Sequence, residues 1–185
     1  MEKSDIKLLI VAAEFKELQV KRFQELAARF EPFDSITSQF FYKKSLWDNK
    51  LKKKLTSFSD EQAIHQEIKL GSHTYRWHFE NRFYDEDHFY VVNSKMAQMI
   101  LSKTVTAEKV RLAFYQQAIM EAKDAKLKAL FEICHELTFE LCVQIKDMIN
   151  GFHSVVRKRG FFYIIKNELE KKLAFLQEML LQEIQ

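Results

Sequence analysis

The stretch 127–155, LKALFEICHELTFELCVQIKDMINGFHSV, decides the fold. Its apolar residues recur at steps of three and four, which is the spacing of one face of an α-helix. That face consists of Leu127, Leu130, Cys134, Leu137, Leu141, Ile145, Met148, Phe152 and Val155. We expect one very long helix that Gly151 bends or ends. Because the face is wide and its spacing departs from the coiled-coil repeat, it predicts packing inside a helical bundle.

The composition of the whole chain agrees with a bundle. The 185 residues include only three Gly and one Pro, whereas 47% of the residues are hydrophobic and seventeen are Phe. Sheet proteins use Gly and Pro in their tight turns, so this shortage disfavours all-β and doubly wound α/β folds. The apolar content is too high for a disordered chain. We therefore predict a mostly α protein, with a single helical domain over 1–185 and about six or seven helices.

Helical spacing predicts the other helices as well. It indicates helices over 5–30, with Ser4 as N-cap, and over 34–58. The apolar stripe of the helix over 34–58 consists of Ile36, Phe40, Trp47, Leu51, Leu55 and Phe58. Further helices are expected over 60–70, from Ser94 to Lys103, from Thr106 to about Asp124, and after Gly160.

Residues 73–92 fit two structures. Tyr75, Trp77 and Phe79 alternate with polar residues, as in a β-hairpin. Tyr75, Phe79 and Phe83 also follow the spacing of a helix. The sequence leaves helix and hairpin open here.

The compartment is inferred from what the chain lacks. We find no run of about 20 apolar residues that could form a transmembrane helix, and no convincing signal peptide. Cys134 and Cys142 are eight residues apart on one expected helix, about 12 Å, which is too far for a disulfide. Reduced thiols indicate the cytoplasm or the nucleus, and we predict a cytoplasmic protein, although export without a signal peptide stays open.

The strongest functional feature is the polar side of the helix over 34–58. Six lysines and two aspartates give this helix a charge of +4, whereas the whole chain carries +3. The lysines are Lys43, Lys44, Lys50, Lys52, Lys53 and Lys54. Basic amphipathic helices bind acidic proteins, nucleic acids or anionic membranes. The alternative interpretation is a solvated face that serves solubility alone.

A second basic group consists of Arg157, Lys158 and Arg159. Its simplest role is to complement the C-terminal dipole of the helix before it. If it shared a face with the lysines of the helix over 34–58, the joint field would strengthen anion binding. We therefore include these three residues among the candidate partner-binding residues.

The residue spacings do not indicate a metal site or a nucleotide-binding site. Glu132 and His135 have the Glu-x-x-His spacing of di-iron bundles, but such sites need a second copy and two further glutamates. Two cysteines on one helix do not make a zinc site. Three scattered glycines cannot form a phosphate-binding loop. We predict no metal and no cofactor.

One pair of residues suggests catalysis. Arg82 and His88 have a spacing similar to that in the metal-independent ribonucleases of the HEPN class, which are helical and act as dimers. The resemblance implies that His88 moves protons while Arg82 stabilises the phosphorane charge. It covers two residues only, and Phe83 and the acidic run 85–87 depart from the pattern.

We expect a regulatory or accessory protein that binds a partner, rather than an enzyme. The favoured partner is an acidic protein surface, bound by the lysines of the helix over 34–58. Nucleic-acid binding, with or without cleavage through Arg82 and His88, is the alternative. Binding to an anionic membrane surface and self-association through the C-terminal helix also stay open.

Overall fold

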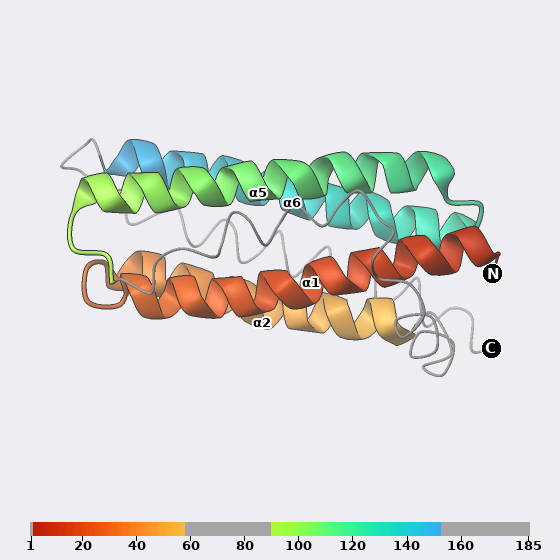
Figure 1. Ribbon diagram of the computed structural model, residues 1–185, viewed down its shortest axis with the longest axis horizontal. Coiled ribbons are helices and arrows are strands. Elements are labelled where there is room, and N and C mark those ends of the chain that lie inside the picture. Colours follow the sequence, from red (N-terminus) through yellow and green to blue (C-terminus); the bar gives the residue numbers. More distant parts are fainter. Residues whose placement is uncertain (1, 58–89, 153–185) are drawn as a thin grey trace. The chain divides into compact units, whose positions relative to one another are not determined.

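The computed structural model describes residues 2–57 and 90–152 (Figure 1). Within these ranges the chain forms four helices and no strand: α1 (Lys3–Phe30), α2 (Ser35–Ser57), α5 (Ser94–Glu121) and α6 (Ala125–Gly151). The prediction of a mostly α fold is confirmed for this part of the chain, and Gly151 ends α6 as the sequence suggested.

Several sequence predictions lie outside the described residues. They are the helices over 60–70 and after Gly160, and the choice between helix and hairpin at 73–89. The described end of that last region, 90–92, contains no strand. All four helices belong to one compact unit that ends at Phe152. A total of six or seven helices and a single domain over 1–185 therefore stay predictions.

Side-chain caps explain where three of the helices begin. Asp34 accepts a hydrogen bond from the backbone N–H of Thr37 at 3.2 Å, at the start of α2. Asn93 accepts one from Met96 at 2.9 Å, at the start of α5. Asp124 caps α6 through Lys126 and Leu127, at 2.9 and 3.1 Å. Each cap satisfies N–H groups that the first helical turn leaves without a partner.

Two predicted boundaries are wrong. The helix α1 begins at Lys3, with Glu2 at the N-cap position, so Ser4 lies inside the helix and is not its cap. The helices predicted to meet near Thr106 are one continuous helix, α5. Thr104 and Thr106 donate their hydroxyl hydrogens to the carbonyls of Ile100 and Ser102, one turn earlier. This bonding satisfies both hydroxyls without ending the helix.

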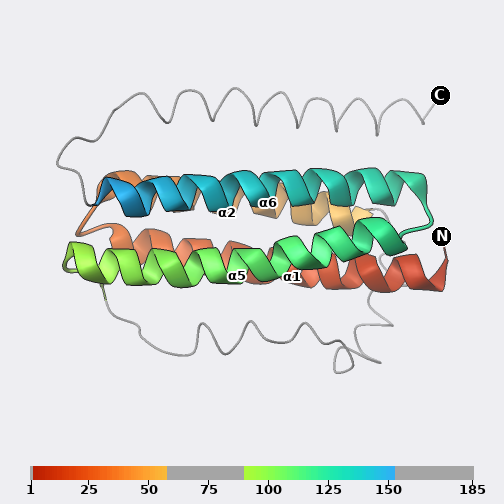
Figure 2. The same ribbon diagram turned by 90° about the horizontal axis from the view of Figure 1, so that it is seen from above.

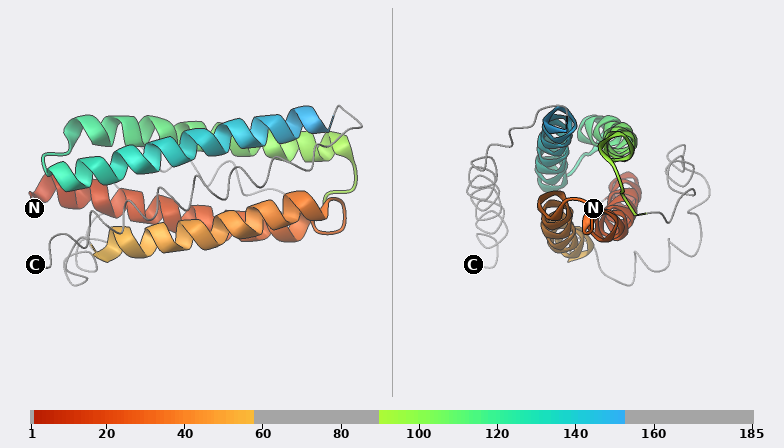
Figure 3. Two further views of the ribbon diagram at one scale, coloured as in Figure 1. Left: turned by 180° about the vertical axis from the view of Figure 1, so that it is seen from behind. Right: turned by 90° about the vertical axis from the view of Figure 1, so that its left-hand side faces the viewer.

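The four helices form two antiparallel hairpins, α1–α2 and α5–α6. The views along and across the helices agree that α1 lies beside α5 and that α2 lies beside α6 (Figures 2 and 3). The backbones approach closely within each hairpin, whereas α1 and α5 do so at few positions. Long side chains therefore fill the space between the hairpins.

Aromatic rings fill much of the core. Phe41 of α2 packs against Phe23 and Phe30 of α1, with ring centroids 5.6 and 6.0 Å apart. Across the hairpins, Phe15 of α1 meets Phe114 of α5 edge-on at 5.0 Å. Each such ring contributes roughly 1.5–3 kcal/mol by leaving water. The heavy Phe content thus serves core packing, as the composition indicated.

Candidate functional site

The helix α2 distributes its lysines around its circumference. Lys43, Lys50 and Lys53 are exposed, whereas Lys52 and Lys54 are half-buried. Lys44 is only 8% exposed and lies in the bundle interior. The expectation that all six lysines form one basic face therefore does not hold for Lys44.

Neighbouring groups weaken the positive charge that Lys52 and Lys54 present to solvent. The Lys52 ammonium lies 3.1 Å from Glu17 of α1, and Lys21 lies 3.0 Å from the same carboxyl group. Hydrogen bonds from Lys21 and Lys52 lower the pKa of Glu17. Burial lowers the pKa of Lys54. Both lysines thus contribute less field at the surface than Lys43, Lys50 and Lys53.

The exposed side of α2 also carries large apolar residues. Tyr42 is 56% exposed and Leu46 is 47% exposed. The spacing of a helix places them in a row with the three exposed lysines. We call this row the outer stripe of α2, and define it as Tyr42, Lys43, Leu46, Lys50 and Lys53.

The remaining residues predicted for the apolar stripe of α2 divide between core and surface. Phe40, Leu51 and Leu55 are buried, as predicted. Ile36 is 42% exposed, and Trp47 is half-buried. The Lys50 ammonium lies 5.1 Å from the centre of the Trp47 ring, which is close enough for a cation–π interaction. This interaction favours a position of the Trp47 ring near the surface.

No negative charge is exposed along α2. Its one acidic residue, Asp48, is buried and pairs with Lys16 of α1 at 2.8 Å. Every exposed or half-buried charge between Ser35 and Ser57 is therefore positive. This arrangement makes the outer stripe a surface suited to anionic groups.

Lys44 belongs instead to a group of buried charged and polar side chains between the hairpins. We call this group the charged layer, and define it as Lys16, Gln19, Lys44, Asp48, Glu108 and Arg111. Gln19 connects the two hairpins, because it accepts a hydrogen bond from Lys16 and donates one to Glu108, each 2.8 Å long. Glu108 also pairs with Arg111 one turn further along α5.

The pKa values of the two lysines of the layer shift in opposite directions, because burial dominates at Lys44 and neighbouring charges together dominate at Lys16. Burial lowers the pKa of Lys44 to about 8, although Asp48 and Glu140 act to raise it. Burial also acts to lower the pKa of Lys16, but Asp48, Cys134 and Glu108 together raise it above its ordinary value. The closer ion pair with Asp48 accounts for the difference, since an opposite charge favours the charged form.

The two thiols of the described residues are not activated nucleophiles. Burial raises the pKa of the Cys134 thiol to about 11 and that of Cys142 to about 11. Thiols are reactive as thiolates, so both buried thiols are inert. Burial raises the pKa of Tyr115 as well.

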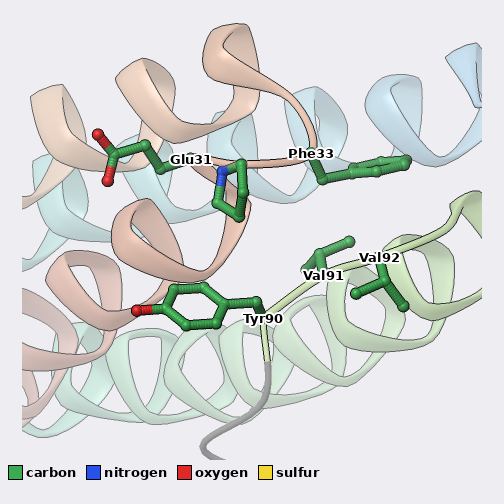
Figure 4. A pocket seen from close by; sticks show the side chains of 6 residues that line it. Glu31, Phe33, Tyr90, Val91 and Val92 are labelled. Carbon is green, nitrogen blue, oxygen red and sulfur yellow. The ribbon is translucent and has the colours of Figure 1, made fainter.

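A shallow cleft lies where the α1–α2 turn meets the segment before α5. Its volume is about 560 Å³, and its lining is mostly apolar. Figure 4 shows Glu31 and Tyr90 pointing to one side of it and Phe33 to the other. A backbone hydrogen bond of 3.0 Å from Val91 to Arg29 holds the two segments together. The cleft could take an apolar side chain, but it assembles no acid–base pair.

The remaining predicted site residues can be placed only in part. Arg82, His88, Arg157, Lys158 and Arg159 lie outside the described residues. Glu132 is exposed and His135 is half-buried on α6. Within 2–57 and 90–152, no three His, Cys, Asp or Glu side chains lie together as metal ligands would. None of the four helices carries an apolar stretch that would span a bilayer.

The sequence reasoning missed the charged layer, although its signal is present. Ala12, Lys16, Gln19 and Phe23 follow steps of four, three and four, which places two polar residues at core positions. Thr104, Glu108, Arg111 and Tyr115 repeat these steps on α5. Polar residues at core spacing on two helices predict a buried polar layer.

Comparisons of the chain with protein-family models, curated proteins and solved structures found no match.

Proposed function

We propose that the protein binds an acidic surface of a partner protein through the outer stripe of α2. The observation that carries this proposal is the charge of α2, whose exposed and half-buried charges are all positive and surround exposed Tyr42 and Leu46. Protein interfaces combine apolar and aromatic contacts at the centre with charged groups at the rim. The outer stripe has this composition.

The buried face of α2 argues against a membrane as the partner. An amphipathic helix binds a membrane by inserting its apolar face among the lipids. On α2 that face includes Phe40, Phe41 and Leu51, each 3% exposed or less. Inserting it would require α2 to leave the bundle.

The number of exposed lysines on α2 argues against nucleic acid as the partner of this helix. Three lysines that contact phosphates would give a slope of about −3 in a plot of log affinity against log salt. Proteins that bind DNA through 6–10 phosphates show far steeper slopes. The stripe also presents Leu46 where a further cation would serve a phosphate backbone better.

The test compares two charge-reversed proteins. In the first, Lys43, Lys50 and Lys53 are replaced by Glu. In the matched control, Lys95, Lys103 and Lys109, all exposed on α5, are replaced by Glu, so that the net charge is the same. Each protein and the wild type are immobilised and exposed to a nuclease-treated extract of the source cell, and retained proteins are identified by mass spectrometry.

The expected result is an acidic protein that the wild type and the α5 variant retain and the stripe variant does not. Its retention should weaken as salt is added, because exposed charges are screened. The same three proteins are titrated with single-stranded RNA and with vesicles rich in anionic lipid. Stripe-dependent binding of RNA or vesicles, without a stripe-dependent protein, would replace the proposal. Identical retention by all three proteins would also contradict it.

A further inference from the structure

The charged layer lies between two hairpins that each contain their own ion pair. Lys16 and Asp48 both belong to the α1–α2 hairpin. Glu108 and Arg111 both belong to α5. Separating the two hairpins would therefore break neither ion pair. It would break the hydrogen bond from Gln19 to Glu108, and it would expose the Lys16 ammonium, which lies 5.9 Å from the Tyr115 ring centre.

Hydration favours such a separation. The layer holds five ionisable side chains, each at most 8% exposed: Lys16, Lys44, Asp48, Glu108 and Arg111. Removing charged groups from water costs free energy that buried ion pairs often do not recover. Opening along the layer would return these groups to water. The free energy gained by their hydration would offset part of the cost of exposing apolar surface.

The packing within each hairpin contrasts with the packing between hairpins. The backbones of α1 and α2 approach closely, as do those of α5 and α6, whereas the closest approach between hairpins involves few positions of α1 and α5. Phe41 packs on three rings of its own hairpin, and Phe131 packs on Phe114 and Tyr115 of its own hairpin. These contacts survive if the hairpins separate, whereas the ring contacts of Phe15 with Phe114 and of Phe33 with Phe152 are lost.

Contacts at the two ends of the layer hold the hairpins together in the closed state. Asp5 of α1 accepts hydrogen bonds from the backbone N–H groups of Lys123 and Asp124, at 3.0 and 3.3 Å. At the other end, Val91 bonds to Arg29, and Phe33 packs against Phe152 at 5.9 Å. Among the described residues, the contact of Phe15 with Phe114 and the ion pair of Glu2 with Lys123 also join the hairpins. Breaking these contacts requires neither hairpin to unfold.

We propose that the bundle opens between its two helical hairpins, along the charged layer, while each hairpin stays folded. Proteins open locally in cooperative units that often coincide with such supersecondary motifs. This opening gives solvent access to the thiol of Cys134, which is fully buried on α6 and lies near Lys16 and Asp48 of the other hairpin.

Cys134 is therefore a native reporter of the opening. The full-length protein is labelled with N-ethylmaleimide at pH 8, and the rate at the peptide containing Cys134 is followed by mass spectrometry. Two variants are compared with the wild type. Gln19→Leu removes the hydrogen bond between the hairpins, and Phe41→Leu weakens packing inside the α1–α2 hairpin. Urea unfolding of each variant measures its global stability.

Gln19→Leu should raise the labelling rate of Cys134 about tenfold, which corresponds to about 1.4 kcal/mol. Phe41→Leu should lower global stability by a comparable amount, because it shrinks a buried ring. It should leave the Cys134 rate within about twofold of the wild type, since its packing persists after opening. Equal effects of the two variants on the Cys134 rate would show that only global unfolding exposes the thiol, and would overturn the proposal.

Discussion

Lys43 and Lys44 are adjacent in the chain, yet α2 places them in opposite environments. Lys43 is exposed on the outer stripe, whereas Lys44 lies in the charged layer, 5.5 Å from the centre of the Phe40 ring. A helix turns by about 100° per residue, so neighbouring side chains near the edge of a buried face diverge. The comparison teaches that a count of lysines overstates the positive potential that a helix presents at its exposed surface. Three of the six lysines are exposed.

The largest effect should come from removing an inner charge. Asp48→Ala leaves the buried ammonium of Lys16 without its ion-pair partner, which should lower the free energy of unfolding by about 3–5 kcal/mol. The control is Asn49→Ala, at the next position and exposed, which should cost less than about 0.5 kcal/mol. Urea denaturation measures both. Similar losses for the two variants would mean that Asp48 is not buried with its partner.

The next effect compares a buried and an exposed carboxylate at the start of α1, Asp5 and Glu2, which both bond to the turn between α5 and α6. Asp5 is 1% exposed and accepts hydrogen bonds from two backbone N–H groups, so Asp5→Ala should cost about 2–3 kcal/mol. Glu2 reaches the exposed Lys123 ammonium at 2.6 Å, and Glu2→Ala should cost nothing measurable, because exposed ion pairs are weak. Thermal and urea unfolding compare the two. A larger loss at Glu2 would reverse this ranking.

A pH-dependent effect should distinguish Lys44 from Lys43. The pKa of Lys44 is about 8 in the folded protein and close to 10.5 in the unfolded chain. Between these values the unfolded state binds more protons, so the stability of the wild type rises with pH relative to Lys44→Met. At pH 7 Lys44→Met should therefore raise the free energy of unfolding above that of the wild type. This gain should be about 2 kcal/mol smaller at pH 10.

The same comparison contains its controls. Cys134, Tyr115 and Lys16 titrate in both the wild type and Lys44→Met, so their contributions largely cancel in the difference. Lys43→Met should change the free energy of unfolding by less than about 0.5 kcal/mol at either pH, since its side chain is exposed. An effect of Lys44→Met that is constant from pH 7 to pH 10 would contradict the burial of Lys44.

The outer stripe as a whole should contribute little to stability. Replacing Lys43, Lys50 and Lys53 by Glu should lower the free energy of unfolding by less than about 1 kcal/mol in total, because each side chain is exposed. Circular dichroism during urea unfolding measures this. A loss as large as that of Asp48→Ala would show that the stripe supports the fold, and its effect on partner binding would then have a structural origin.

Much of the described fold follows from local patterns in the sequence. The apolar spacing of 127–152 predicted α6, and the same periodicity predicted α1 and α2 nearly to their ends. The break expected near Thr106 failed because Thr106 was interpreted as the start of a new helix. The hydroxyls of Thr104 and Thr106 bond to the preceding turn, so α5 continues through them.

The candidate site was predictable only in part. The lysines of α2 were identified, but the burial of Lys44 depends on the edge of a face that α6 and α1 cover. Sequence periodicity locates such an edge to within a residue or two, which is the difference between Lys43 and Lys44. Polar residues at core spacing indicate the charged layer on α1 and α5, but no local pattern indicates that Lys16 pairs with Asp48, 32 residues away.

The most direct test is a titration of the lysine side chains by NMR. The protein is labelled with ¹³C-lysine, and the Cε resonances are assigned by single Lys→Arg variants and followed from pH 6 to pH 11. Lys44 should titrate near pH 8, because it is buried inside the bundle. A Lys44 resonance that titrates near its ordinary pKa of 10.5 would place this side chain in solvent. The division of α2 into a charged interior and a binding exterior would then be wrong.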